Sequence, residues 1–163
     1  DLVEHLYAVG KSMGSDLDGV AKNTPSFFVW AIRDSYTAPL QRVQIIKGYV
    51  DSNGSPQEQV FDVACSDGGS PDPVTYRCPD NNAKVDIANC AISQDVGDAE
   101  LKAFWSDPTF EVDQRAFYYV RALENPTCRW STWDAIRNNV EPRPDMPKTI
   151  QERVWSSPIH YIP

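Results

Sequence analysis

Arginine and tryptophan side chains gather in two stretches near the end of the chain. The members of this set are Arg129, Trp130, Trp133, Glu152, Arg153 and Trp155. Indole faces and guanidinium groups together can stack on sugar rings or form the centre of a protein–protein interface. The competing interpretation is that the tryptophans fill the core and that Arg153 pairs with an acid. The set is therefore a candidate ligand platform or domain interface.

The sequence contains no reaction motif. It has no glycine-rich phosphate loop, no Gly-x-Ser-x-Gly nucleophile turn and no His-Glu-x-x-His zinc motif. Of its two histidines, His5 and His160, the second stands beside Tyr161 in a terminal strand, which is more typical of a packed or surface residue than of a base. Asp16-Leu-Asp18 and Asp51-Ser-Asn-Gly54 lack the evenly spaced oxygen ligands and closing glutamate of a calcium loop. We therefore predict no catalytic, cofactor-binding or metal-binding residue in this chain.

Four cysteines occur at long spacings, namely Cys65, Cys78, Cys90 and Cys128. The absence of any Cys-x-x-Cys argues against a zinc ribbon. An even number in loop-like surroundings favours two disulfides and an oxidising compartment, either the periplasm or the exterior. Four buried free thiols in a cytosolic protein are the alternative. Three connectivities are possible, and Cys65–Cys78 with Cys90–Cys128 is favoured because the first pair closes one irregular loop.

Short apolar and β-branched runs between turn residues predict a mainly β fold. Strands are expected over residues 26–34, 40–51, 58–65, 84–92, 100–105, 115–124 and 150–155. The first of them is apolar on both faces, which predicts a central strand covered on both sides. Asp51-Ser-Asn-Gly54 predicts a hairpin turn between the second and the third strand. The Gly, Pro, Asp and Asn content of residues 66–82 predicts a long loop.

These elements fit one domain, since the chain has 163 residues. Residues 1–24, which contain Gly10, Gly14 and Gly19, are interpreted as a linker that enters a module spanning residues 25–163. A short helix is expected over residues 132–138, with Thr132 as its N-cap. The pattern predicts an antiparallel β-sandwich, immunoglobulin-like or related, with long irregular loops and at most one or two short helices.

Charge excludes some classes of partner. The net charge is −8 and the isoelectric point is near 4.6. Nucleic acid requires clustered Lys and Arg, and anionic membrane surfaces require a basic face, so neither partner is expected. No apolar run of about 18 residues is present, and no membrane insertion is predicted. The start at Asp1, without an initiator methionine or a signal peptide, suggests a processed or excised piece of a longer protein.

Several segments resemble one known family. They are Phe117-Tyr-Tyr-Val-Arg121, Asn125-Pro-Thr-Cys-Arg-Trp130 and Gln151-Glu-Arg-Val-Trp-Ser-Ser-Pro-Ile159, with further matches at Met13-Gly-Ser-Asp-Leu17, Pro25-Ser-Phe-Phe-Val-Trp-Ala31, Val43-Gln-Ile-Ile-Lys-Gly48 and Asp107-Pro108. In this order they resemble the C-terminal part of a bacterial family of large proteins, domain-of-unknown-function family 3604. The resemblance extends over nearly the whole chain.

The resemblance implies a secreted or periplasmic protein whose larger N-terminal part is similar to metal-dependent hydrolases of the polymerase-and-histidinol-phosphatase (PHP) type. The metal ligands of such a part lie upstream, in a barrel, and none of their motifs occurs here. His160 stands where the family is expected to have a tryptophan, which argues against a catalytic role.

We therefore expect a non-catalytic C-terminal module that needs no cofactor. Its partner would be the upstream catalytic domain of the same protein, on which it packs or whose substrate cleft it shapes. Hydrolase activity, if the parent protein has it, would belong to that upstream domain. The alternative function is a carbohydrate-binding module that uses exposed tryptophans, namely Trp130, Trp133 or Trp155.

Overall fold

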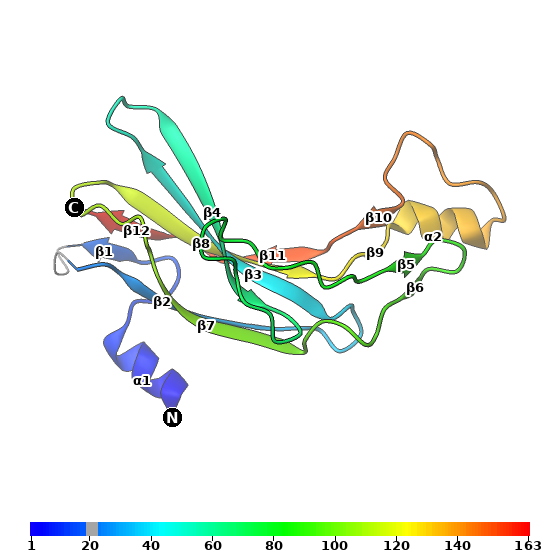
Figure 1. Cartoon of the computed structure of the whole chain (residues 1–163), viewed down its shortest axis with the longest axis horizontal. Coiled ribbons are helices and arrows are strands. Elements are labelled where there is room, and N and C mark those ends of the chain that lie inside the picture. The colour runs from blue at the N-terminus through cyan, green and yellow to red at the C-terminus, as the bar shows by residue number, and fades with distance from the viewer. Residues whose placement is uncertain (19–22) are drawn as a thin grey trace.

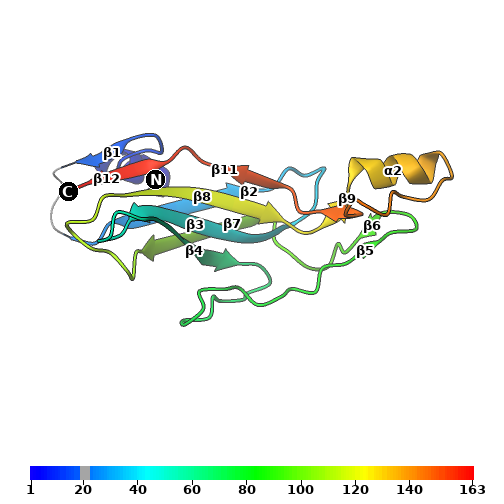
Figure 2. The ribbon, with the colours of Figure 1, turned by 90° about the horizontal axis from the view of Figure 1, so that it is seen from above.

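The described part of the chain folds into a mainly β structure with two short helices, as the sequence predicts (Figures 1 and 2). The computed structural model describes residues 1–18 and 23–163. Its largest element is a six-stranded sheet with the order β1-β12-β8-β3-β4, in which β11 also pairs with β8. These strands are β1 (Asp16–Asp18), β3 (Leu40–Val50), β4 (Pro56–Cys65), β8 (Ala116–Glu124), β11 (Arg153–Trp155) and β12 (Ile159–Ile162).

The long strand β3 is the centre of this sheet, because it pairs antiparallel with β4 on one side and with β8 on the other. The predicted hairpin turn joins β3 to β4, and the Asp51 carboxylate stabilises it by accepting hydrogen bonds from the backbone N–H groups of Asn53 and Ser55, each at 2.9 Å. Strands β11 and β12 lie one after the other along β8. β1 runs parallel to β12, which departs from the all-antiparallel prediction.

A two-stranded ribbon, β2 (Ser26–Ile32) and β7 (Glu100–Ser106), lies against one face of the large sheet (Figure 2). Its inward side chains join the core around Val43, Ile45 and Tyr118; they are Phe27, Val29, Ala31, Leu101, Ala103 and Trp105. No layer of the described residues covers the opposite side of the ribbon, where Ile32 is 69% exposed. The prediction that β2 is central and covered on both sides is therefore wrong, because an apolar face at a molecular surface leaves the same sequence pattern as a buried one.

A buried ion pair joins β3 to the residue that follows β7. Lys47 Nζ is 2.7 Å from Asp107 Oδ2, and both side chains are almost fully buried. Lys47 also donates to the backbone carbonyl of Thr109 at 2.8 Å, and the Tyr118 hydroxyl donates to Asp107 at 2.8 Å. Burial alone would raise the pKa of Asp107, but hydrogen bonds from Lys47, Thr109 and Tyr118 hold that pKa below its ordinary value.

A smaller extension forms one end of the molecule (Figure 1). It consists of the pairs β5 (Val85–Asp86) with β6 (Ala91–Ile92) and β9 (Thr127–Cys128) with β10 (Thr149–Ile150), and of α2 (Trp130–Arg137). The prediction of one strand over residues 84–92 is wrong, because the chain turns back near Cys90, whose φ is 58°. The prediction of one strand over residues 150–155 is also wrong, because residues 151–152 separate β10 from β11.

The second helix begins earlier than predicted. Its N-cap is Arg129 rather than Thr132, whose hydroxyl instead donates to the carbonyl of Lys148 at 2.7 Å. The first helix, α1 (Leu2–Val9), and β1 both lie inside the segment interpreted as a linker. Of that segment, residues 19–22 lie outside the described residues.

Both favoured disulfides are present. Cys65–Cys78 ties the long loop to the end of β4, and Cys90–Cys128 ties the β5–β6 hairpin to β9. By loop-closure entropy the first bond contributes about 3 kcal/mol and the second about 4 kcal/mol. Two disulfides indicate an oxidising compartment outside the cytoplasm.

Candidate functional site

An open cavity of about 830 Å³ lies between the start of β3, the loop after Cys78, the N-terminus of α2 and the segment from β10 to β11. Among its lining residues are Gln41, Arg42, Arg129, Thr149, Gln151 and Arg153. Arg129 and Arg153 belong to the set singled out in the sequence, and they line the same cavity although 24 positions separate them. We call this feature the arginine cavity.

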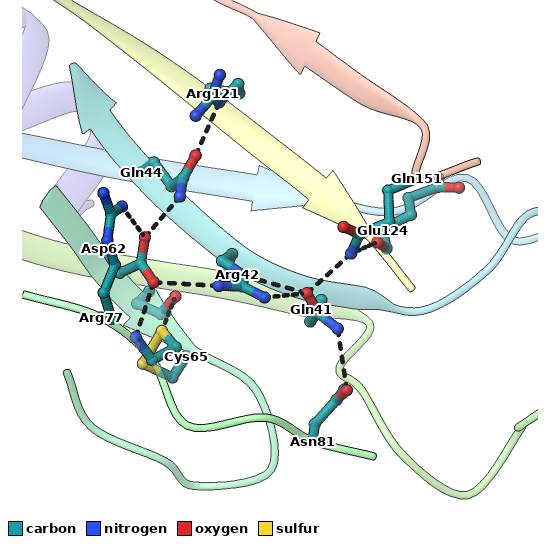
Figure 3. Close-up of polar contacts among 12 residues, drawn as sticks. Gln41, Arg42, Gln44, Asp62, Cys65, Arg77, Asn81, Arg121, Glu124 and Gln151 are labelled. Atoms are coloured by element: carbon teal, nitrogen blue, oxygen red, sulfur yellow. Dashed lines mark hydrogen bonds and ion pairs between the residues drawn. A yellow bond between two sulfur atoms is a disulfide. The ribbon is translucent and has the colours of Figure 1, made fainter. Parts of the chain in front are cut away.

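A buried glutamine holds the wall of the arginine cavity together (Figure 3). The side-chain oxygen of Gln41 accepts hydrogen bonds from Arg42 Nε at 3.0 Å and from Gln151 Nε2 at 2.8 Å. Its amide nitrogen donates to Asn81 at 3.0 Å. Gln151 also donates to the backbone carbonyl of Glu124 at 3.0 Å. One side chain thus joins β3 to the long loop and to the segment that follows β10.

Beside Gln41, the fully buried carboxylate of Asp62 fixes a second group of donors (Figure 3). It accepts from Gln44 Nε2 at 2.6 Å and from the backbone N–H of Cys78 at 2.7 Å. Arg42 and Arg77 approach it at 3.4 and 3.5 Å. A buried carboxylate with this many donors is fully compensated, so it fixes the position of Arg42 at the cavity.

The other two guanidinium groups of the arginine cavity have no acidic partner within 4.0 Å among the described residues. Arg129 Nε is buried and has no hydrogen-bond acceptor there. Arg153 Nε donates only to the backbone carbonyl of Gln151, at 3.1 Å. Asp80 is the single acidic residue in the lining and Arg42 is paired with Asp62, so Arg129 and Arg153 leave the cavity positively charged on a chain whose net charge is −8.

The three tryptophans of the predicted set lie outside the cavity lining. Trp130 and Trp133 are on α2 and Trp155 is on β11, with exposed fractions of 70%, 39% and 55%. The interpretation that they fill the core is therefore wrong. The guanidinium of Arg137 lies over the Trp133 ring, with its central carbon 5.7 Å from the ring centroid. Glu152 is exposed, and its backbone carbonyl accepts from the N–H of Glu124 at 3.0 Å.

The sequence missed the amide side chains of the cavity wall. Gln41, Gln44 and Lys47 are polar residues at buried positions of an otherwise apolar strand. Such positions are unfavourable unless each polar group finds a partner, so they could have marked β3 as the strand that carries a polar network.

The two histidines, His5 on α1 and His160 on β12, are both exposed. Within residues 1–18 and 23–163, no group of three or more His, Cys, Asp or Glu side chains is placed to hold a metal ion.

A second surface feature is the outer face of the β2–β7 ribbon, formed by Phe28, Trp30, Ile32 and Phe104. The rings of Phe28 and Phe104 pair at 4.7 Å between centroids. Charged residues border these side chains, since Trp30 Nε1 donates to Glu100 at 3.0 Å and Lys102 lies over the Trp30 ring. An apolar patch with a charged border is typical of protein interfaces.

The helix α1 adds to the same side of the molecule. None of its residues is buried, and Leu2, Tyr7 and Val9 are exposed. Figure 1 shows α1 and the ribbon on the same side of the large sheet, and the ribbon's outer face is the one opposite its core-facing side chains. An isolated helix of eight residues is marginal in water, so burial against another surface would stabilise it.

Comparisons with known proteins gave one match. The model of a family described as "Protein of unknown function (DUF3604)" matches residues 1–163. No curated protein and no solved structure matches the chain. Of the helices in the described residues, neither is long and apolar enough to cross a membrane.

Proposed function

We propose, given that the chain belongs to the DUF3604 family, that it is a non-catalytic module which packs against a catalytic domain of the same protein. That domain would be a metal-dependent hydrolase of the PHP type, encoded upstream in a secreted or periplasmic bacterial protein. The ribbon and the large sheet would be the two layers of a β-sandwich, immunoglobulin-like or related. The module would stabilise the hydrolase or shape one wall of its substrate cleft.

The observation that carries this proposal is the exposed apolar outer face of the ribbon. Phe28, Trp30, Ile32 and Phe104 alternate with core residues, so β2 is apolar on both sides, and Glu100 and Lys102 of β7 lie at the border of the outer face. A ribbon that only covered the core would have polar residues on its outer side. Burying this face together with α1 against an apolar surface of the neighbouring domain accounts for both features.

The test replaces Ile32 by aspartate in the full-length protein and in this chain alone. Because Ile32 is 69% exposed, the I32D change should leave the melting temperature of this chain nearly unchanged. In the full-length protein it should lower the melting temperature and the rate of phosphoester hydrolysis. Val74→Asp, at an 81% exposed valine in the long loop, is the matched control and should have no effect in either protein.

Equal behaviour of the I32D and V74D full-length proteins would contradict the docking surface. Stoichiometric bound metal together with turnover in this chain alone would contradict the non-catalytic assignment. Metal analysis and an activity assay are therefore carried out on both the full-length protein and this chain alone.

A carbohydrate-binding function is the second candidate, and the exposure of Trp130 and Trp155 favours it. Exposed indole rings offer apolar faces for sugar rings. Soluble glycans would then quench the tryptophan fluorescence in a saturable way. Trp130→Ala or Trp155→Ala would remove this saturable quenching. Trp30→Ala, on the outer face of the ribbon, is the control and should leave the quenching unchanged. A glycan titration that leaves the fluorescence of the unmodified chain unchanged would exclude this function.

A further inference from the structure

We propose that the arginine cavity binds an oxyanion, namely the carboxylate, sulfate or phosphate group of a small polar molecule. This site is separate from the docking face and does not depend on the function proposed above. Its ligand contacts would come from Arg129 and Arg153, while Arg42, paired with Asp62, forms part of the fixed wall.

The first argument is that the cavity lacks negative charge opposite two of its arginines. Arg129 and Arg153 line it without a carboxylate partner among the described residues, and the Nε of Arg129 is buried without an acceptor. The Arg153 side chain is exposed and its other donors are open to water, whereas a buried donor such as the Nε of Arg129 normally has a partner. A carboxylate, sulfate or phosphate group presents two acceptor oxygens to the guanidinium fork, so an oxyanion is the ligand that these donors fit best.

The second argument is preorganisation. Gln151 and Arg42 both donate to Gln41, and Arg42 is held in turn by Asp62, so this wall is fixed before any ligand enters. Arg153 donates to the carbonyl of Gln151 itself, which ties its guanidinium to the same network. A ligand that meets fixed donors loses less entropy on binding than one that must order them.

The third argument is the helix that begins at the cavity. Arg129 is the N-cap of α2, and the first turn of α2 contains no acidic residue. The N-terminus of a helix carries a partial positive charge, which adds to that of the guanidinium groups. No acidic side chain of α2 therefore opposes an anion at this end.

The size of the cavity indicates more than a free inorganic ion. A volume of about 830 Å³ falls in the range of sites for small organic ligands. Thr149, Pro126 and Ile150 also line the cavity and would face the uncharged part of the ligand. An acidic sugar has both the oxyanion and such a body, so glucuronate is the appropriate organic probe.

The experiment is a calorimetric titration of the chain with sodium sulfate, sodium phosphate and sodium glucuronate at constant ionic strength. Glucose serves as the neutral probe. We expect saturable binding of glucuronate and of at least one inorganic anion, with no binding of glucose. Tighter binding of glucuronate than of sulfate and phosphate assigns the site to an organic ligand, and the reverse order assigns it to a free ion.

The variants Arg129→Gln and Arg153→Gln should each weaken binding about tenfold, as expected for the loss of one charge-assisted hydrogen bond. Arg115→Gln, at an exposed arginine outside the cavity, makes the same change of net charge and should leave the affinity unchanged. Melting curves verify that each variant is folded, and R153Q keeps the test valid if R129Q is not. Absence of saturable binding, or equal weakening by R115Q and R153Q, would overturn the proposal.

Discussion

At the scale of single residues, the polar groups inside this protein are arranged to compensate each other. Asp62 accepts three hydrogen bonds and forms an ion pair with Arg77, and Asp107 accepts from Lys47, Thr109 and Tyr118. These hydrogen bonds keep the pKa of Asp107 below its ordinary value at a place where burial alone would raise it. The sequence does not indicate the Lys47–Asp107 pair, because these residues are 60 positions apart and meet only after β3 is in place.

Replacing Asp107 by asparagine should reveal the buried pair. The D107N change leaves the Lys47 ammonium buried without its counterion, and we expect the free energy of unfolding at pH 7 to fall by about 3 kcal/mol or more. The native-state pKa of Asp107 lies below its ordinary value, so its contribution is present above the unfolded-state pKa near 3.8 and is lost as the pH falls through the native-state pKa.

Urea denaturation between pH 7 and pH 2 measures this effect. The difference between wild type and D107N should be constant near neutral pH and should shrink below pH 3.8. Asp113→Asn, at an exposed aspartate, is the control and should follow the wild type. A difference that stays constant down to pH 2 would mean that Asp107 stabilises the fold through its shape rather than its charge.

At the scale of elements, β3 and β8 show how closely neighbouring strands approach. Gly48 lies opposite Phe117, and a Cβ atom added at Gly48 would be 2.2 Å from the Phe117 ring. The ring thus occupies the space that a side chain on β3 would need. Cross-strand packing of an aromatic ring over a glycine stabilises a strand that glycine alone would weaken.

The Gly48→Ala change should destabilise the protein by about 1–2 kcal/mol, because the Phe117 ring must leave its place over β3. In a Phe117→Ala background the same change should cost nothing or stabilise the strand slightly, since the space is then free. A double-mutant cycle from thermal or urea unfolding measures this coupling. Additive effects of the two changes would show that the ring moves aside without cost.

The sequence predicted the long elements better than the short ones. The β3–β4 hairpin, β7 and β8 follow from alternating apolar residues and from a strong turn at Asp51–Gly54. The short strands β5, β6, β9 and β10 have two residues each, which is a single period of the alternation and too short to recognise as a pattern. Their positions depend on the Cys90–Cys128 bond and on backbone contacts such as Arg129 N–H to Lys148 O, at 3.0 Å.

The same reasoning applies to the candidate site. Arg129 and Arg153 were singled out for their residue types, but their meeting at one cavity depends on the path of residues 147–153 over the start of β3. Gln41 and Gln151, 110 positions apart, are joined by a hydrogen bond that no local pattern indicates. Residue types predicted the cations, whereas tertiary packing determined which of them share a site.

At the scale of the whole molecule, the question is where the folded unit begins. The sequence places the boundary at residue 24, and the structure provides contacts that start earlier. Gly14 N–H donates to the carbonyl of Pro158 at 2.9 Å, and the carbonyl of Ser15 accepts from His160 N–H at 3.1 Å. Leu17 packs against the core, and β1 pairs with β12. In contrast, no residue of α1 is buried.

Two truncations separate these possibilities. Removal of residues 1–12 deletes α1 only, and we expect a change in melting temperature within about 2 °C, because no buried contact is lost. Removal of residues 1–24 also deletes β1 and Leu17 and leaves β12 as an edge strand, so the melting temperature should fall by about 5 °C or more. Differential scanning calorimetry of both truncated proteins beside the complete chain measures these changes.

Equal melting temperatures of the two truncated proteins would place the boundary at residue 24 and would make β1 part of a linker. A large loss after removal of residues 1–12 alone would instead show that α1 stabilises the module by itself, which would weaken its assignment to the docking surface.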